Sequence, residues 1–130
     1  EEIYEQADML SLHIPLNDET RGMVNEEYLG KFRKKIWLIN TARGEVVPLA
    51  ALNSALRSGK VIGAALDVLE NEKLQKLSEQ ERENFKEIIA SDKVLFTPHV
   101  AGWTYESYVR INEILADKIK AAIGFQGFGG

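Results

Sequence analysis

The sequence contains no cysteine and only two histidines, His13 and His99. Without cysteine, disulfides and thiolate metal sites are excluded, and so few histidines argue against a histidine-rich metal centre. No apolar run approaches the ~20 residues of a membrane span, and no signal peptide is recognisable. These absences predict a cytoplasmic protein that has no membrane partner and no bound metal.

An excess of positive charge is also missing, because 16 lysines and arginines face 20 aspartates and glutamates, for a net charge of −4. Proteins that bind nucleic acid or an acidic membrane need a basic face, so neither partner is expected. What is present is ordinary for a globular domain with a real core, since the 130 residues are 45% hydrophobic and 28% charged.

Short apolar runs alternate along the chain with segments that have helical spacing. Asn25 and Thr104 stand where helix N-caps belong, Ser78 with Glu81 makes a capping box, and Gly59 suits a left-handed helix end. Strands alternating with helices predict an α/β fold with a parallel sheet, and four strands suggest half of a doubly wound sheet. The expected strands are 9–14, 36–39, 61–68 and 93–96, and the expected helices are 26–32, 48–58, 78–90 and a long one after 104.

Three further expectations concern burial and order. The near-continuous apolar run 36–39 suits a strand that is covered on both faces. The glycine-rich tail 124–130 is expected to fray. The long helix after Thr104 has one apolar side that is expected to be buried, which consists of Tyr108, Ile111, Ile114, Leu115, Ile119 and Ala122.

Each expected strand is followed by a group with chemical potential. Because the carboxyl ends of parallel strands share one edge of the sheet, these groups are expected to converge there, where ligands bind in such folds. An arginine can grip a carboxylate with a planar fork, and a histidine moves a proton near neutral pH, more readily beside a carboxylate. The groups are His13–Pro15, Thr41–Arg43, Asp67 with Glu70 and Glu72 after it, and Pro98–His99.

Ordinary interpretations of the same residues stay open. His99 can be a loop histidine bonded to backbone, Asp67 a turn former or helix cap, and Glu70 and Glu72 a solvated acidic loop. Convergence at one edge favours acid–base chemistry on a small anionic substrate over four independent coincidences. Taken by themselves, the residues predict an enzyme active site or an anion site.

Four motifs around these groups resemble the C-terminal part of the D-isomer-specific 2-hydroxyacid dehydrogenases, and among them members like D-3-phosphoglycerate dehydrogenase. They cover most of the chain in the right order and spacing. The motifs are 11–16 with Thr20, 38–47, 63–72 and 97–104.

The resemblance implies part of a Rossmann-type, doubly wound parallel sheet. Residues 1–103 are then the C-terminal half of a dinucleotide-binding domain, 104–123 a long helix leading back towards the substrate domain, and 124–130 a flexible tail. The implied activity is hydride transfer between NAD(H) and a D-2-hydroxy acid or 2-keto acid, with 3-phosphoglycerate or a similar acid favoured on overall resemblance. A homodimer is implied for the full-length enzyme.

The resemblance also assigns roles to residues. Arg43 would bind the substrate carboxylate and carbonyl, and His99 would be the general acid/base. Glu72, rather than Glu70, would pair with His99, and Asp67 would contact the nicotinamide carboxamide. Residues that would line the cofactor are His13, Pro15, Thr20, Thr41, Ala42, Arg43, Asp67, His99, Ala101 and Gly102.

The sequence departs from the family pattern in two places. Lys73 stands where the family usually has proline, and no Gly-x-Gly-x-x-Gly occurs anywhere in the chain. The chain is therefore expected to be a fragment that is inactive alone, with the glycine fingerprint and the residue that selects NAD or NADP lying upstream. An alternative is an NAD-sensing, corepressor-like interaction protein on the same fold, although no partner-docking tail is recognisable and the acidic composition favours metabolism.

Overall fold

The computed structural model describes residues 1–71, 75 and 77–124. The chain divides into two compact units, Glu1–His99 and Val100–Gly130. The first unit holds the sheet and its covering helices, and the second holds one long helix.

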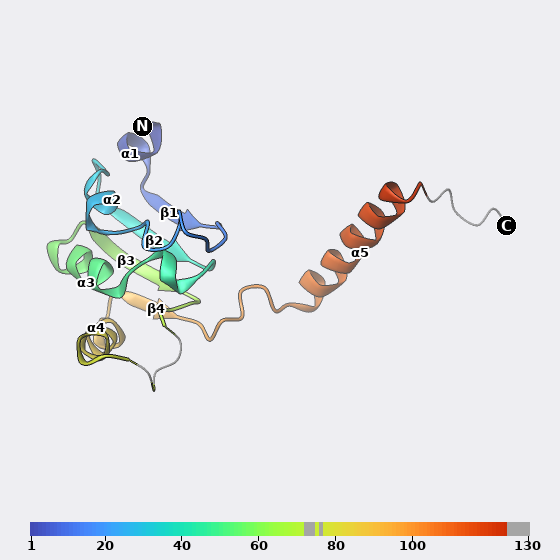
Figure 1. The fold of residues 1–130 in the computed structure, drawn as a ribbon. Coiled ribbons are helices and arrows are strands. Elements are labelled where there is room, and N and C mark those ends of the chain that lie inside the picture. The colour runs from blue at the N-terminus through green and yellow to red at the C-terminus, as the bar shows by residue number, and fades with distance from the viewer. Residues whose placement is uncertain (72–74, 76, 125–130) are drawn as a thin grey trace. The chain divides into compact units, whose positions relative to one another are not determined.

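The first unit is built on a sheet of four parallel strands in the order β1-β2-β3-β4 (Figure 1). This confirms the predicted α/β class and the parallel sheet. The first and third strands end two residues before the expected bound, the second extends by one residue, and the fourth begins one residue later. The strands are β1 (Met9–Leu12), β2 (Ile36–Asn40), β3 (Val61–Leu66) and β4 (Val94–Phe96).

Helices connect the strands, and their ends follow the capping signals in the sequence. The Asn25 side chain accepts a hydrogen bond from the Tyr28 amide at 2.9 Å, and Gly59 has φ 72° at the end of its helix. The Ser78–Glu81 capping box is present in full. The helices are α1 (Glu2–Gln6), α2 (Glu26–Gly30), α3 (Leu49–Ser58) and α4 (Glu79–Ala90), with a 3-10 turn, η1 (Gly44–Val46).

The core lies between the sheet and helices α2, α3 and α4. Alternate residues of β1 and β2 point into it, as the period of two in a strand requires. Phe32, Leu52 and Ile88 fill the space opposite the strands and are fully buried. Burial of this set is the main source of stability of the first unit.

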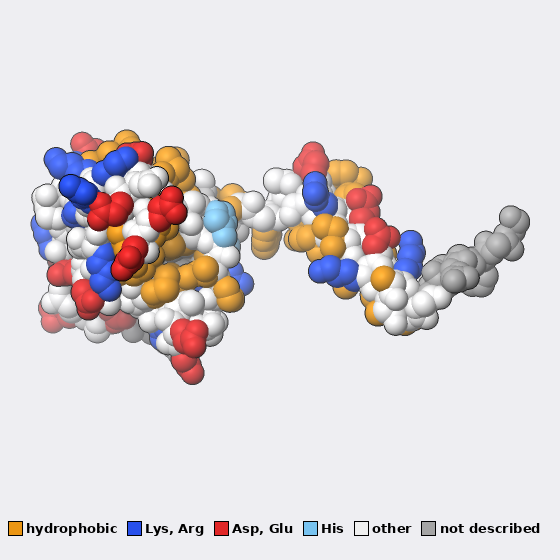
Figure 2. All heavy atoms as spheres, turned by 90° about the horizontal axis from the view of Figure 1, so that it is seen from above, with side chains coloured by type: hydrophobic (Ala, Val, Ile, Leu, Met, Phe, Trp, Pro, Cys, Tyr) orange, Lys and Arg blue, Asp and Glu red, His pale blue; other side chains and the backbone are white. Residues whose placement is uncertain are grey.

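Charges of both signs are mixed on the face of the first unit that Figure 2 shows. Four basic residues stand just before β2, and three of them, Lys31, Arg33 and Lys34, form ion pairs with acids of the same chain. Lys34 lies 3.0 Å from Asp8, and Arg33 lies 2.9 Å from Glu5. Each of these exposed pairs contributes little to stability. They nevertheless explain the basic residues by contacts within the chain, so that no separate acidic binding partner is needed to account for them.

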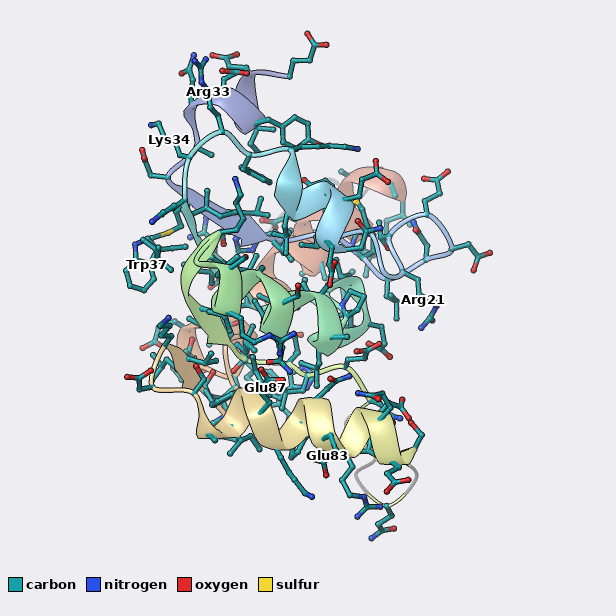
Figure 3. The ribbon with its side chains drawn as sticks, turned by 90° about the vertical axis from the view of Figure 1, so that its left-hand side faces the viewer. Arg21, Arg33, Lys34, Trp37, Glu83 and Glu87 are labelled. Carbon is teal, nitrogen blue, oxygen red and sulfur yellow. The ribbon has the colours of Figure 1, made fainter. Side chains whose placement is uncertain are left out.

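The opposite face of the sheet is different. Trp37 is 48% exposed and lies over Gly63, where an added Cβ would come within 2.2 Å of the ring carbon Cζ3. Figure 3 looks onto α3 and α4, with Trp37, the second residue of β2, projecting to one side of these helices. The expectation that 36–39 is covered on both faces is therefore wrong for the first unit, because α2, α3 and α4 all lie on one face.

The second unit contains α5 (Tyr105–Ala122), which begins at Thr104, whose hydroxyl accepts a hydrogen bond from the Ser107 amide at 3.1 Å. All 18 residues of α5 are described, and none is buried. The second unit by itself does not provide the burial that was expected for the apolar side of this helix: Tyr108, Ile111, Ile114, Leu115, Ile119 and Ala122 are exposed. Helical spacing fixes which residues share a side, but it does not supply a segment to cover that side.

Residues 125–130 of the expected tail lie outside the described residues. Across the part of the chain that the structure describes, no helix has the length and apolar character needed to cross a membrane.

Candidate functional site

The four strands end in register at one edge of the sheet. Leu12 pairs with Asn40, Asn40 with Leu66, and Leu66 with Phe96, so the last residues of the strands form one row. All four arrowheads point to the same side (Figure 1). The residues that follow this row, His13, Thr41, Asp67 and Thr97, therefore leave the sheet at the same level, as the sequence predicts for a parallel sheet.

The turn after β1 is closed by its own polar groups. The Thr20 hydroxyl donates to the Pro15 carbonyl at 2.7 Å and accepts from the Asn17 amide at 2.9 Å. Ser11 Oγ lies 2.8 Å from His13 Nε2. Thr20 is thus engaged in shaping this turn, while the His13 and Pro15 side chains are exposed at the edge.

The turn after β2 presents Arg43. Asn40, the last residue of the strand, is 1% exposed, and its side chain bonds to both ends of the turn. Its Oδ1 accepts from the Ala42 amide at 3.0 Å, and its Nδ2 donates to the Arg43 carbonyl at 3.0 Å. The Arg43 side chain is exposed, and its Nη1 donates to the Ala42 carbonyl at 2.7 Å. The backbone of this turn is buried while its arginine faces solvent.

Gly44 brings the arginine turn against the segment that follows β3. A Cβ at Gly44 would lie 2.0 Å from the Leu69 carbonyl carbon and 2.4 Å from the Glu70 nitrogen, so only glycine permits this approach. Close by, the Glu70 carboxylate accepts a hydrogen bond from the Leu49 amide at 2.8 Å, which satisfies a free amide in the first turn of α3. Glu70 is therefore not the solvated loop acid that one interpretation of the sequence expected.

The ends of β3 and β4 are joined beyond the strands. The Asp67 amide donates to the Asn40 carbonyl at 3.0 Å, and the Thr97 amide donates to the Leu66 carbonyl at 3.0 Å. The Asp67 side chain is buried, at 5% exposed, and its Oδ1 accepts a hydrogen bond from the Thr97 hydroxyl at 2.5 Å. A buried carboxylate thus lies at the centre of the edge, between the two turns.

His99 lies on the exposed side of the edge. Its backbone has φ 56°, a conformation that residues other than glycine adopt rarely, and its amide donates to the Thr97 carbonyl at 3.0 Å. Asp67 and His99 both line a groove of about 650 Å³ between the strand ends and α4, whose apolar walls include Phe85, Ile89 and Phe96.

The structure therefore gathers most of the predicted residues at one edge. Arg43, Asp67 and His99 follow neighbouring strands, with His13, Pro15, Thr20, Thr41 and Ala42 in the two turns alongside. Glu72 lies outside the described residues. Ala101 and Gly102 belong to the second unit.

Three residues that shape the site were missed by sequence reasoning. Asn40 stands directly before the turn, Gly44 directly after Arg43, and Thr97 directly before a proline and a histidine. An asparagine at the end of an apolar strand is a signal for a side-chain-closed turn. The partners of Gly44 and Thr97 are about 25 and 30 positions away in the chain, so no local pattern identifies them.

Two described groups outside the turns at the strand ends, Tyr28 and Glu81, have shifted pKa values. Burial raises the pKa of Tyr28, and neighbouring Tyr4 adds to that effect. Hydrogen bonds from Ser78 lower the pKa of Glu81. Among the described residues, no cluster of three or more histidine, cysteine or acidic side chains is placed to hold a metal ion.

Comparisons with known proteins show similarity to the D-isomer specific 2-hydroxyacid dehydrogenases. Residues 1–101 match the sequence model of the D-isomer specific 2-hydroxyacid dehydrogenase, NAD binding domain. The chain is 40% identical over 121 residues to a glyoxylate reductase of Thermofilum pendens, covering 93% of this chain and 33% of that protein. It is 36% identical over 119 residues to D-3-phosphoglycerate dehydrogenase of Bacillus subtilis, covering 92% of this chain and 21% of that protein.

Solved structures agree with these sequence matches. The crystal structure of D-lactate dehydrogenase from Aquifex aeolicus, complexed with NAD and lactic acid, matches 95% of this chain and 39% of that one, with a TM-score of 0.72 and 35% identity. The chain spans only about a third of the length of the first curated relatives that it matches, since it covers 33%, 37% and 34% of those proteins.

Proposed function

The chain belongs to the D-isomer specific 2-hydroxyacid dehydrogenase family and carries its NAD-binding domain, and we propose that the protein containing it transfers hydride between NAD(H) and a D-2-hydroxy acid or 2-keto acid. One observation supports this most directly. The row of strand ends brings a cation, a buried carboxylate and a histidine to a single edge of the sheet. That edge is where open α/β sheets bind their ligands.

In the proposed reaction, Arg43 binds the substrate carboxylate and carbonyl. Its exposed guanidinium offers a planar fork of donors that matches a carboxylate in shape and charge. When the keto acid is reduced, the same cation stabilises the negative charge that develops on the carbonyl oxygen. Bound NADH supplies the hydride in this chemistry.

His99 is the proposed general acid/base. In the reduction it gives a proton to the carbonyl oxygen, and in the reverse direction it takes that proton back. We assign Glu72 as its partner, which keeps the imidazole protonated and oriented. Glu70 is less suited to that role, since its carboxylate already accepts the Leu49 amide.

The described residues fit the nicotinamide half of NAD. The buried Asp67 carboxylate at the edge is an acceptor suited to the amide hydrogens of the carboxamide, which is the role we propose for it. The turns after β1 and β2 supply backbone groups beside it. Proposed cofactor-lining residues are His13, Pro15, Thr20, Thr41, Ala42, Arg43, His99, Ala101 and Gly102.

The substrate within this class is a narrower proposal. We take 3-phosphoglycerate as the first acid to examine, because D-3-phosphoglycerate dehydrogenase of Bacillus subtilis is among the relatives. Glyoxylate, pyruvate and hydroxypyruvate belong in the same panel, in the keto-acid direction with NADH. The acid with the highest kcat/KM identifies the substrate, and 3-phosphohydroxypyruvate is the expected one.

The domain limits and assembly are further proposals. Residues 1–103 would complete the second half of the dinucleotide-binding domain, and 104–123 would be the helix leading back to a substrate domain. A cytoplasmic homodimer is expected for the full-length protein. Analytical ultracentrifugation and cell fractionation test these two properties directly.

The proposed function is tested by removing each reacting group in the full-length protein. Arg43→Ala and His99→Ala are each expected to lower kcat/KM for the keto acid by about 10²- to 10⁴-fold, the range that a positioned acid or charge contributes. NADH oxidation is followed by absorbance, with circular dichroism to verify folding. Arg33→Ala is the matched control. Arg33 is an exposed arginine that pairs with Glu5, and it stands before the start of β2, whereas Arg43 follows the end of that strand.

Unchanged turnover in either active-site variant contradicts the assignment. A protein that binds NADH tightly but reduces no 2-keto acid supports the NAD-sensing alternative instead. Both outcomes are read from the same preparations, since NADH binding is measured by fluorescence titration before the keto acid is added.

A further inference from the structure

We propose that Asn40 is a positioning residue for Arg43, which holds the arginine turn in the shape that binds the substrate carboxylate. The inference rests on the proposed function, because it deepens the role given to Arg43. It concerns a residue that contacts neither substrate nor cofactor and acts through the backbone of its own turn.

The observation that carries the proposal is that both polar atoms of one buried side-chain amide form hydrogen bonds within the arginine turn. Asn40 is 1% exposed, and its Oδ1 and Nδ2 bind the Ala42 amide and the Arg43 carbonyl, each at 3.0 Å. Its own carbonyl accepts from the Asp67 amide at 3.0 Å. One residue therefore fixes both ends of the arginine turn and ties that turn to the strand that carries Asp67.

The chemistry of this position is specific to asparagine. The side chain must donate at one atom and accept at the other, within the reach of a single short side chain. Asn40→Asp keeps the acceptor for Ala42 but removes the donor and places a carboxylate oxygen against the Arg43 carbonyl. Asn40→Ala leaves the buried Ala42 amide without its partner. In both variants the turn is expected to shift and carry the Arg43 Cα with it.

Such a shift matters because the turn aims the arginine. The carbonyl of Arg43 also accepts from the Val46 amide at 3.3 Å, so the turn has little slack between β2 and η1. A misplacement of about 1 Å costs up to about 10²-fold in rate when a binding group must meet a substrate in one geometry. The expected effect of Asn40 variants is therefore on the keto acid rather than on NADH.

A purely structural role is the competing explanation, and the chain offers a matched control for it. Asn53 is the other buried asparagine, 2% exposed, and its Nδ2 donates to the Asn84 carbonyl at 2.9 Å. It lies on α3 and links that helix to α4, away from the row of strand ends. Substituting Asn53 removes a comparable buried hydrogen bond without touching the arginine turn.

The experiment compares Asn40→Ala, Asn40→Asp, Asn53→Ala and Asn53→Asp in the full-length protein. We measure Tm, the Kd for NADH, and kcat/KM for a 2-keto acid and for its amide, which lacks the carboxylate. Asn40 variants are expected to lose about 10- to 100-fold in kcat/KM for the acid, with an NADH Kd within about two-fold and a smaller loss for the amide. Asn53 variants are expected to lower Tm and leave the acid-to-amide ratio unchanged.

If the Asn40 variants are also less stable, a double-mutant cycle with Arg43→Ala separates a loss of activity that acts through Arg43 from one that does not. If Asn40 acts through Arg43, adding Asn40→Ala to Arg43→Ala causes no further loss in kcat/KM. Losses that multiply overturn the proposal, as does an acid-to-amide ratio that Asn40 variants leave at the wild-type value. If Arg43→Ala alone leaves kcat/KM unchanged, the proposed function fails, which is a separate result from failure of the positioning role.

Discussion

The two turns that flank the buried Asp67 are held in different ways. The Asn40–Gly44 turn has a buried backbone, two side-chain hydrogen bonds from one asparagine, and a glycine pressed against the Leu69–Glu70 segment. The Thr97–His99 turn is exposed, follows a strand of only three residues, and keeps His99 at φ 56°. The arginine side of the site is thus part of the core of the first unit, while the histidine side lies on its surface.

This difference shows that the packing of the first unit specifies one of the two turns more completely than the other. The arginine turn is specified by contacts among described residues, so its geometry is expected to be present before any ligand binds. The histidine turn is tied to the sheet by the Thr97 amide and hydroxyl. The comparison predicts that substitutions on the arginine side cost folding energy and activity together, and that those on the histidine side mostly cost activity.

The largest expected effect comes from Gly44→Ala. The added methyl would lie 2.0 Å from the Leu69 carbonyl carbon, so either the arginine turn or the Leu69–Glu70 segment must move. We expect a loss of about 3 kcal/mol in the free energy of unfolding, at the upper end for overpacking, together with a fall in kcat/KM for the keto acid. Denaturant unfolding and steady-state kinetics on the same variant measure both.

Gly30→Ala is the control for that substitution. Nothing lies within 4 Å of a Cβ at Gly30, which ends α2. We expect a change of no more than about 1 kcal/mol, in the stabilising direction where the backbone fits alanine. Equal destabilisation by both substitutions would contradict the view that contact with Leu69 is what requires glycine at position 44.

A smaller effect is expected from Glu70, whose carboxylate joins the segment after β3 to the start of α3. Glu70→Ala removes the acceptor for the Leu49 amide at the start of α3 and should cost about 1 kcal/mol, as loss of a helix N-terminal acceptor does. Glu70→Gln keeps an oxygen that can accept the same bond and should recover most of that loss. Failure of the glutamine to recover stability would show that charge near the helix end, and not the hydrogen bond, is what matters.

On the histidine side, Thr97→Val removes the hydroxyl that donates to Asp67. Because Thr97 is exposed, we expect a stability loss of about 1 kcal/mol or less, although the bond involves an ionisable partner. The larger change is expected in the KM for NADH, since Asp67 is the proposed carboxamide acceptor. Thr97→Ser retains the hydroxyl and should behave as the wild type. A normal KM for NADH in Thr97→Val would remove the proposed role of this bond.

A feature of the fold or of the candidate site could be predicted from the sequence where the residues that determine it are close together in the chain. Caps at Asn25, Ser78 and Thr104, and the left-handed end at Gly59, act within a few residues, and the structure confirms each of them. The order of residues along parallel strands also follows from the chain, so the convergence of Arg43 and His99 at one edge was expected.

Predictions that depend on distant partners did less well. The apolar side of α5 and the exposed ring of Trp37 have the composition of buried surfaces, yet the described residues do not cover them. Position 44 requires glycine because the backbone of Leu69, 25 positions later, lies against it, and no local pattern reveals that contact. Burial and close approach are properties of the folded arrangement, whereas capping and periodicity are properties of a short window of sequence.

The smallest expected effect tests α4, the helix that walls the groove beside His99. Hydrogen bonds from the Ser78 hydroxyl and amide, and more weakly from Asn71, lower the pKa of Glu81. A lowered folded-state pKa adds stability that is present above the unfolded-state pKa and is lost as pH falls through the folded-state value.

Glu81→Gln should therefore be less stable than the wild type at about pH 7, and the two should converge as pH falls below about 4. Glu83→Gln is the control, because it removes the same charge from the same helix without touching the cap. The difference between the two variants in the free energy of unfolding, followed over pH, measures the contribution of the cap. A difference between Glu81→Gln and the wild type that stays constant down to low pH would show that the ionised carboxylate is not what stabilises the start of α4.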